Sequence, residues 1–163
     1  SAVGLDGLSE LIEERKELKT RVGVIEFGSD DVLNFPDGLL GFPDQKRFVL
    51  VQHKENSPFR WLLSIDDTNL AFLVVDPAEY VTDYAPPMPK RASDALRLDH
   101  TTPMLVYTIV TIPSGHPEDM TLNLAGPVVV NCEAGLGRQI VLDDEAYPVR
   151  HRAFAQSGEG KAA

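Results

Sequence analysis

Short segments rich in β-branched, aromatic and aliphatic residues recur along this chain, and turn-forming residues separate them. We predict strands over residues 22–27, 31–35, 47–53, 59–65, 70–75, 104–112, 120–124, 127–132 and 137–142. The first two are expected to pair as a hairpin. Strands this short and numerous favour a mostly β fold, a closed antiparallel β-barrel or a barrel-like sandwich, because closure removes the exposed edges of an open sheet.

Helices are expected at only two places. The segment 8–19 places Leu8, Leu11, Ile12 and Leu18 on one face of a helix. A second, short helix is expected over 90–98, after a proline-rich connector. The chain therefore divides into an N-terminal helical extension over residues 1–19, a single barrel domain over 20–154 and a disordered tail over 155–163.

The segment 121–131, with the sequence TLNLAGPVVVN, predicts a strand, a tight turn and a second strand. Pro127 lacks an amide hydrogen and suits the start of a strand, while Gly126 permits dihedral angles that other residues avoid. The side-chain amides of Asn123 and Asn131 can lock this turn through backbone hydrogen bonds or face a binding partner. The sequence leaves both roles open.

Together with residues 35–42 (FPDGLLGF) and 71–77 (AFLVVDP), this segment resembles the FliW family of flagellar assembly factors. The resemblance covers roughly residues 20–154. It implies a non-enzymatic protein that binds flagellin and, when free of it, binds and antagonises the RNA-binding translational regulator CsrA. Such a protein couples flagellin synthesis to export in the cytoplasm.

Acidic residues outnumber basic ones by 25 to 15, which gives a net charge of −10. This balance disfavours direct binding to nucleic acid, because the phosphate backbone attracts cationic surfaces. No Lys or Arg occurs between Arg60 and Lys90, a stretch that carries five carboxylates. These are either solvated loop residues or an acidic surface that meets a basic protein partner.

If these carboxylates form an acidic surface, the run from Asp66 to Tyr84 is predicted to be part of the CsrA-binding face. Tyr84 is expected to be exposed and to act as an aromatic anchor beside the acids, and Asp76 is expected to cap a short turn over 78–80. With the two asparagines, the full set of predicted partner-binding residues comprises Asp66, Asp67, Asp76, Asp83, Tyr84, Asn123 and Asn131.

An apolar groove is expected to hold flagellin, because the export segments of flagellin are helical and apolar on one face. The sequence leaves open whether this groove overlaps the surface that binds CsrA. The candidates are Phe35, Leu39, Leu40 and Phe42, in the turn that contains Pro36, or the region near Leu124 and Val128. The alternative for the aromatic residues of this turn is a purely structural role, anchoring the loop to the core.

Catalytic and metal-binding patterns are weak in this sequence. Its four histidines show no metal-ligand spacing, and its single cysteine, Cys132, is expected to be a buried thiol at a strand end. We therefore predict no enzyme activity, no metal and no cofactor. Two other functions stay open: a β-barrel that encloses a small ligand, and a hydrolase built from loop carboxylates with His100 or His116.

The predicted location follows from features that the sequence lacks. No apolar run approaches the ~20 residues needed to cross a bilayer, and residues 1–19 show no signal-peptide pattern. We therefore expect a cytoplasmic protein with no membrane contact, monomeric when free of its partners.

Overall fold

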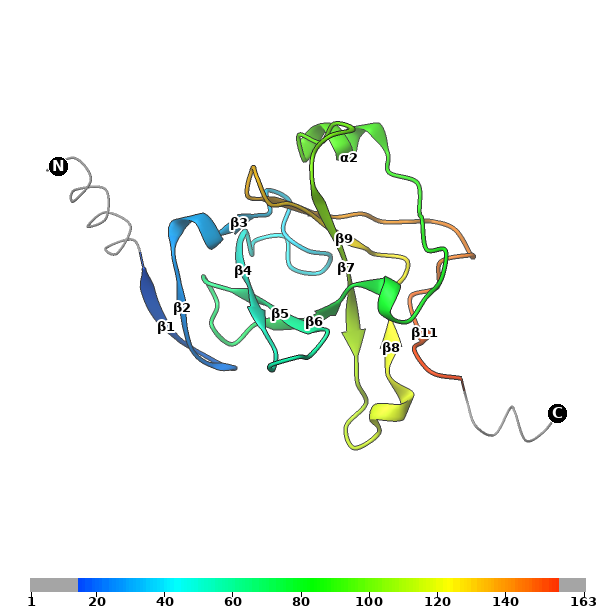
Figure 1. Cartoon of the computed structure of the whole chain (residues 1–163), viewed down its shortest axis with the longest axis horizontal. Helices are drawn as coiled ribbons and strands as arrows, with labels where there is room; N and C mark the ends of the chain where they lie inside the picture. The colour runs from blue at the N-terminus through cyan, green and yellow to red at the C-terminus, as the bar shows by residue number, and fades with distance from the viewer. Residues whose placement is uncertain (1–14, 156–163) are drawn as a thin grey trace, which may run out of the picture.

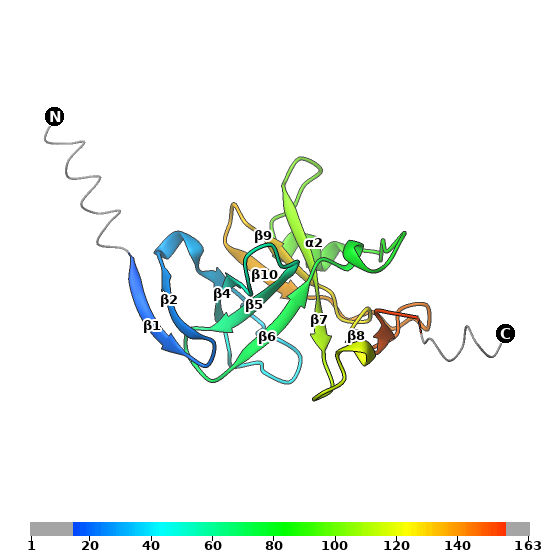
Figure 2. The ribbon, with the colours of Figure 1, turned by 60° about the horizontal axis from the view of Figure 1, so that its bottom comes forward.

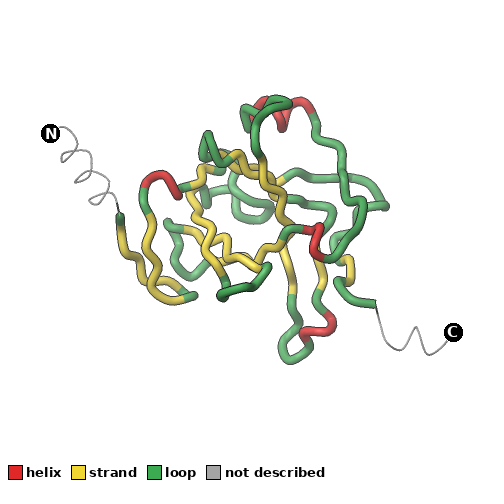
Figure 3. The backbone as a smooth tube through the Cα atoms, viewed as in Figure 1, coloured by secondary structure: helices red, strands yellow, loops and turns green. Residues whose placement is uncertain are grey.

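The structure, a computed structural model, describes residues 15–155. Short strands dominate it, with one short α-helix, α2 (Lys90–Ala95), and three 3₁₀ turns, η1 (Ser29–Asp31), η2 (Pro77–Glu79) and η3 (Pro117–Asp119), in the described part of the chain (Figures 1 and 3). The strands are β1 (Lys16–Thr20), β2 (Gly23–Phe27), β3 (Leu33–Asn34), β4 (Arg47–Gln52), β5 (Phe59–Ser64), β6 (Ala71–Val75), β7 (Met104–Thr111), β8 (Thr121–Leu122), β9 (Val128–Asn131), β10 (Leu136–Gln139) and β11 (His151–Arg152).

Seven strands close into a barrel in the order β7-β6-β5-β4-β3-β10-β9, with β9 pairing back onto β7. This confirms the predicted barrel. All neighbours in the ring are antiparallel except β3 and β10, which run parallel through the pair Leu136 and Asn34. A ring with an odd number of strands cannot alternate direction all the way round, so one parallel contact is required. The expectation of a wholly antiparallel barrel therefore fails at this one position.

Large side chains fill the barrel. Phe35, Phe48 and Val74 are fully buried, and Leu62 and Val128 are nearly so, in one continuous core. The rings of Phe35 and Phe48 pack edge to face with centroids 5.1 Å apart. Since these side chains occupy the interior, the packing counts against the alternative of a barrel that encloses a small ligand.

Strands β8 and β9 act as two halves of one broken strand along a single edge of β7. Val110 pairs with Leu122 in β8, whereas Tyr107 pairs with Val128 in β9. The five residues 123–127 lie between the two halves, and we call them the β8–β9 break. The predicted strand, turn and strand are present, but the two strands pair with β7 rather than with each other.

Asn123, at the start of the break, and Asn131, at the end of β9, have structural roles. Asn131 is 2% exposed; its Nδ2 donates to the carbonyl of Leu96, and its Oδ1 accepts from the amides of Glu133 and Ala134. The Oδ1 of Asn123 accepts from the amide of Ala125. Asn131 is therefore not available to a partner, and its expected place in the binding surface is wrong.

The N-terminal expectations are partly wrong. Residues 16–19 of the predicted helix belong to β1, which pairs with β2, so the hairpin expected between 22–27 and 31–35 does not form. Leu18 and Ile25 pack this β1–β2 hairpin against Val49 and Leu63 on the outside of the barrel. The hairpin lies at the opposite side of the molecule from β8 and β11 (Figures 1 and 2). Residues 8–14 and 156–163 lie outside the described part.

The remaining elements depart from the sequence expectations in detail. The predicted helix over 90–98 is shorter and ends at Ala95, and the short strand β11 was missed. Cys132 is exposed, so the expected buried thiol is wrong. It directly follows Asn131, the last residue of β9, where the chain leaves the barrel wall.

Candidate functional site

Two surface grooves in the described part of the chain contain residues predicted to bind partners. The first, which we call the Leu40 groove, has a volume of about 370 Å³ and lies between the loop 37–43 and the end of β10. The second, which we call the β7 groove, has a volume of about 460 Å³ and lies between β7 and the connector after η2. Both volumes fall in the range of ordinary ligand and peptide sites.

The loop of the Leu40 groove is a tight turn. The amide of Phe42 donates to the carbonyl of Leu39 at 2.7 Å, and the amide of Leu39 donates back at 3.2 Å. Gly38 has a φ of +65°, and a Cβ there would lie 2.3 Å from the carbonyl oxygen of Phe42. Only glycine fits at this position, which explains the first glycine of the FPDGLLGF motif physically.

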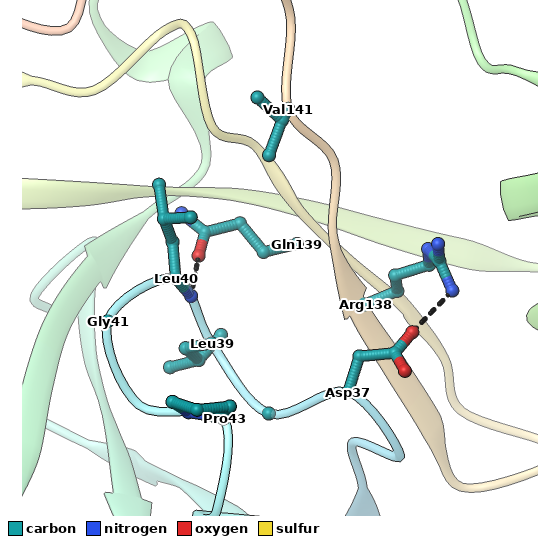
Figure 4. A pocket seen from close by; sticks show the side chains of 9 residues that line it. Asp37, Leu39, Leu40, Gly41, Pro43, Arg138, Gln139 and Val141 are labelled. Atoms are coloured by element: carbon teal, nitrogen blue, oxygen red, sulfur yellow. Dashed lines mark hydrogen bonds and ion pairs between the residues drawn. The ribbon is translucent and has the colours of Figure 1, made fainter.

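Two side chains of β10 fasten this loop to the barrel, as Figure 4 shows. Oε1 of Gln139 accepts from the amide of Leu40 at 2.8 Å, and its Nε2 donates to the carbonyl of Gly126 in the β8–β9 break. Nη1 of Arg138 lies 2.6 Å from Oδ2 of Asp37. The polar groups at this groove therefore already have partners.

The apolar side chains at this groove divide into buried and exposed ones. Phe35 is fully buried and Leu39 is 3% exposed, so Phe35 cannot line an open groove and that expectation is wrong. Leu40 is 67% exposed and Val141 is 64% exposed, and they project beside the groove (Figure 4). Phe42 packs its ring against Phe72. Sequence reasoning missed Val141, whose signal was an aliphatic residue near the end of the predicted strand 137–142.

The β7 groove brings together three of the predicted partner-binding residues, Asp76, Asp83 and Tyr84. Its walls are apolar side chains of β7 and of the connector. The full lining is Asp76, Pro77, Ala78, Val81, Asp83, Tyr84, Ala85, Pro86, Met88, Met104 and Val106. In the described residues, neither Asp76 nor Asp83 has an ion-pair partner. This groove therefore combines apolar walls with free negative charge.

Asp66 and Asp67 are not part of this groove. They lie in the β5–β6 turn, and β6 separates them from Asp76 by five residues, a length of about 17 Å. Asp66 is paired with Arg47 from β4, whose Nη2 lies 2.5 Å from its Oδ1. The hydrogen bond and charge of Asp66 raise the pKa of Arg47 above its usual value. The acidic run is continuous in sequence, but its two ends occupy different places on the barrel.

Tyr84 is half-buried, so the expected exposed anchor is wrong. Its hydroxyl donates to the carbonyl of Leu124 in the β8–β9 break at 2.6 Å, and its ring packs edge to face on Tyr147. Burial, and secondarily the nearby Tyr147, raise the pKa of Tyr84 well above its usual value. By contrast, the predicted cap is confirmed, because Oδ1 of Asp76 accepts from the amide of Ala78 at the start of η2.

One group of possible metal or acid–base ligands lies within the described residues. His116, Glu118 and Asp119 in η3 and its flank place one ligand atom each within 4.8 Å of one another. His116 and Glu118 are exposed, and Asp119 is engaged by Arg152 at 2.7 Å. The group lines neither of these two grooves.

This geometry is that of a small β-barrel with a filled interior, whose candidate binding features lie on its outer surface. Across residues 15–155, no helix reaches the length and apolar character needed to cross a membrane. The fold and the grooves define a small, filled β-barrel with grooves on its outer surface.

Comparison with known proteins identifies the family. The FliW protein family model matches residues 16–153. A flagellar assembly factor FliW from Desulfitobacterium hafniense (strain DSM 10664 / DCB-2) is 39% identical over 85% of this chain and 90% of its own. The protein of the same name from Thermosipho africanus is 35% identical over 82% of this chain and 92% of its own. A crystal structure of the flagellar assembly factor FliW aligns with a TM-score of 0.80 at 29% identity, over 87% of this chain and 99% of the other. The chain belongs to the FliW family.

Proposed function

We propose that this protein is a non-enzymatic, cytoplasmic flagellar assembly factor that binds flagellin and, when free of it, binds and antagonises CsrA. Family membership supports the general role. The observation that carries the assignment of partners is that one barrel bears two grooves with different chemistry, one with exposed aliphatic side chains and one with free carboxylates.

Flagellin is assigned to the Leu40 groove. Leu40 and Val141 present exposed aliphatic side chains beside it, while the nearby charges of Asp37 and Arg138 neutralise each other. An amphipathic helix buries its apolar face in a hydrophobic groove and gains free energy in proportion to the apolar area removed from water. The Leu40 groove supplies that kind of surface.

CsrA is assigned to the β7 groove. A protein that binds RNA carries positive charge for the phosphate backbone, and its affinity depends steeply on that charge. The free carboxylates of Asp76 and Asp83 attract such a partner and lower its positive potential once bound. Loss of that potential weakens RNA binding even where the RNA surface itself is not covered.

The two grooves share a structural neighbour, the β8–β9 break. At the Leu40 groove, Gln139 donates a hydrogen bond to the carbonyl of Gly126 in the break. At the β7 groove, Tyr84 donates one to the carbonyl of Leu124 in the break. A shift of the break gives each partner a route to weaken binding of the other without overlap of their sites. Linkage requires that flagellin and CsrA weaken each other by the same factor.

The test is a displacement titration. Flagellin is added to a preformed complex of this protein with fluorescently labelled CsrA, and release of the label is followed by anisotropy. The proposal expects release at flagellin concentrations near its own dissociation constant. A stable ternary complex on size exclusion, with both partners saturating, would contradict mutual exclusion, and absence of CsrA binding would contradict the assignment of CsrA.

A further inference from the structure

Half of β7 has one edge without a strand partner in the described part of the chain. On one side, β9 pairs with Met104 through Tyr107. On the other side, β6 pairs only with Thr108 and Ile109, and β6 ends at Val75. In the described part of the chain, no strand pairs with the second edge of residues 104–106.

The direction of the backbone groups along β7 can be assigned from one hydrogen bond. The amide of Asn123 donates to the carbonyl of Ile109, so the backbone groups of Ile109 point towards β8 and β9. Alternate residues of a strand direct their N–H and C=O groups to opposite edges. Met104 and Val106 therefore direct theirs away from β9, and these are the two residues of β7 that line the β7 groove.

The chain itself does not fill this edge, for a reason visible in its sequence. The connector opposite β7 contains Pro86, Pro87 and Pro89, which lack the N–H that strand pairing needs. The connector is also fixed at both ends, because the hydroxyl of Tyr84 donates to the carbonyl of Leu124 and Met88 packs into the cluster under α2, which also contains Val106 of β7. The space between β7 and the connector remains open as the β7 groove.

The lining of the groove specifies the chemistry of an occupant. Val81, Met88 and Met104 supply apolar contact area, and methionine side chains adapt to different shapes. The carboxylates of Asp76 and Asp83 have no ion-pair partner in the described residues. A strand presents alternate side chains to opposite faces, so one strand can offer both apolar and cationic groups.

We propose that an extended protein segment, in which apolar residues alternate with lysine or arginine, adds to the barrel as a strand along Met104–Val106. The inference rests on the proposed function for the identity of the partner, because Asp76 and Asp83 belong to the surface assigned there to CsrA. Beyond the proposed function, the inference specifies the mode of binding. Backbone hydrogen bonds to β7 give affinity, and the groove and its carboxylates give specificity.

The probe is a fluorescein-labelled, N-acetylated eight-residue peptide in which valine alternates with lysine, and binding is measured by anisotropy. We expect saturable binding that weakens as salt rises. Two further peptides of the same sequence are N-methylated on alternate residues, one on the valines and one on the lysines. In each of them, one edge of the peptide lacks N–H donors and cannot form the backbone hydrogen bonds of a β-ladder. The N-methylated peptide that blocks the groups facing β7 is expected to bind about tenfold more weakly or worse, because several hydrogen bonds are lost.

Two double variants of the protein form a matched pair. Asp76→Asn with Asp83→Asn keeps a good cap at η2 and suits the positive φ of residue 83, +59°. It is expected to weaken the lysine peptide severalfold and to flatten its salt dependence. Glu26→Gln with Glu55→Gln makes the same change in net charge at exposed positions that do not line the groove, and it is expected to have no effect.

Each outcome decides the inference. Equal binding of the parent and both N-methylated peptides would overturn strand addition, as would absence of parent binding at millimolar peptide. Dimerisation in sedimentation equilibrium that the peptide does not reverse, and that substitutions at Met104 and Val106 abolish, would show that a second copy takes the edge and would also overturn it. CsrA is tested separately: CsrA binding without peptide binding overturns the inference alone, whereas peptide binding without CsrA binding overturns the proposed function alone.

Discussion

The Leu40 groove and the β7 groove have similar volumes, yet their polar groups are in opposite states. At the Leu40 groove, Gln139 binds the loop amide and Arg138 neutralises Asp37, so exposed aliphatic side chains are what remains for a partner. At the β7 groove, in the described residues, two carboxylates have no ion-pair partner and one strand edge has no strand partner. The comparison indicates that one small barrel separates recognition by apolar area from recognition by charge and backbone.

Gly38→Ala is expected to have the largest effect. It forces a side chain into a left-handed conformation and places a Cβ against the carbonyl of Phe42, so the free energy of unfolding should fall by about 2 kcal/mol or more. Gly41→Ala is the control: φ is +86° there, but no atom lies within 4 Å of the new Cβ, so about 1 kcal/mol is expected. Urea unfolding of both variants measures the difference. Equal losses would show that the close approach at Gly38 is unimportant.

Leu40→Asp should disrupt only the first groove. Leu40 is 67% exposed, so the unfolding free energy should change by less than about 0.5 kcal/mol. Burying the new charge against an apolar partner should weaken flagellin binding by about tenfold to a hundredfold while CsrA affinity stays unchanged. Isothermal titration calorimetry with each partner gives both numbers. A parallel loss of CsrA affinity would merge the two grooves into one site.

Asp76→Asn with Asp83→Asn should disrupt only the second groove. We expect the association rate with CsrA to fall about severalfold at low salt and the difference to shrink at high salt, since charge steers encounter. Stopped-flow measurements over a salt series, with Glu26→Gln and Glu55→Gln as the charge-matched control, test this. If the control pair slowed association equally, net charge rather than the groove would explain the steering.

Tyr84→Phe is expected to have the smallest effect. It removes the hydrogen bond to Leu124 and should lower the unfolding free energy by about 1 kcal/mol near neutral pH. Because the pKa of Tyr84 is raised in the folded state, its stabilisation is present below its unfolded pKa of about 10 and is lost as the pH rises above that value. Urea unfolding at pH 8 and pH 11 should therefore show a smaller gap between the two proteins at pH 11. A gap that does not change would place Tyr84 in solvent.

Local sequence patterns predicted the features that depend on local interactions. The β-branched run 104–112 forms β7, and Asp76 caps η2, because both depend on neighbours in sequence. Leu18 suggested a helix wrongly, since the same apolar residue suits a helix face and an alternating strand. The partner of β1 was not visible either, because strand pairing is a non-local choice.

The sites were harder to predict than the fold. Tyr84 is buried by Leu124 and Tyr147, residues far along the chain, so its neighbouring acids suggested exposure wrongly. The acidic run 66–84 suggested a single acidic face. In the structure, Asp66 and Asp76 lie at opposite ends of β6, and Arg47 from β4 neutralises Asp66. The free edge of β7 has no sequence signal except the prolines opposite it.

The most direct test of the separation of the two grooves is NMR chemical-shift mapping on amide- and methyl-labelled protein, with each partner added in turn. Flagellin should give its largest shifts at the methyl groups of Leu40 and Val141. CsrA should give its largest shifts at the amides of Met104 and Val106. If both partners shifted the same set of residues most strongly, the assignment of separate grooves would be contradicted.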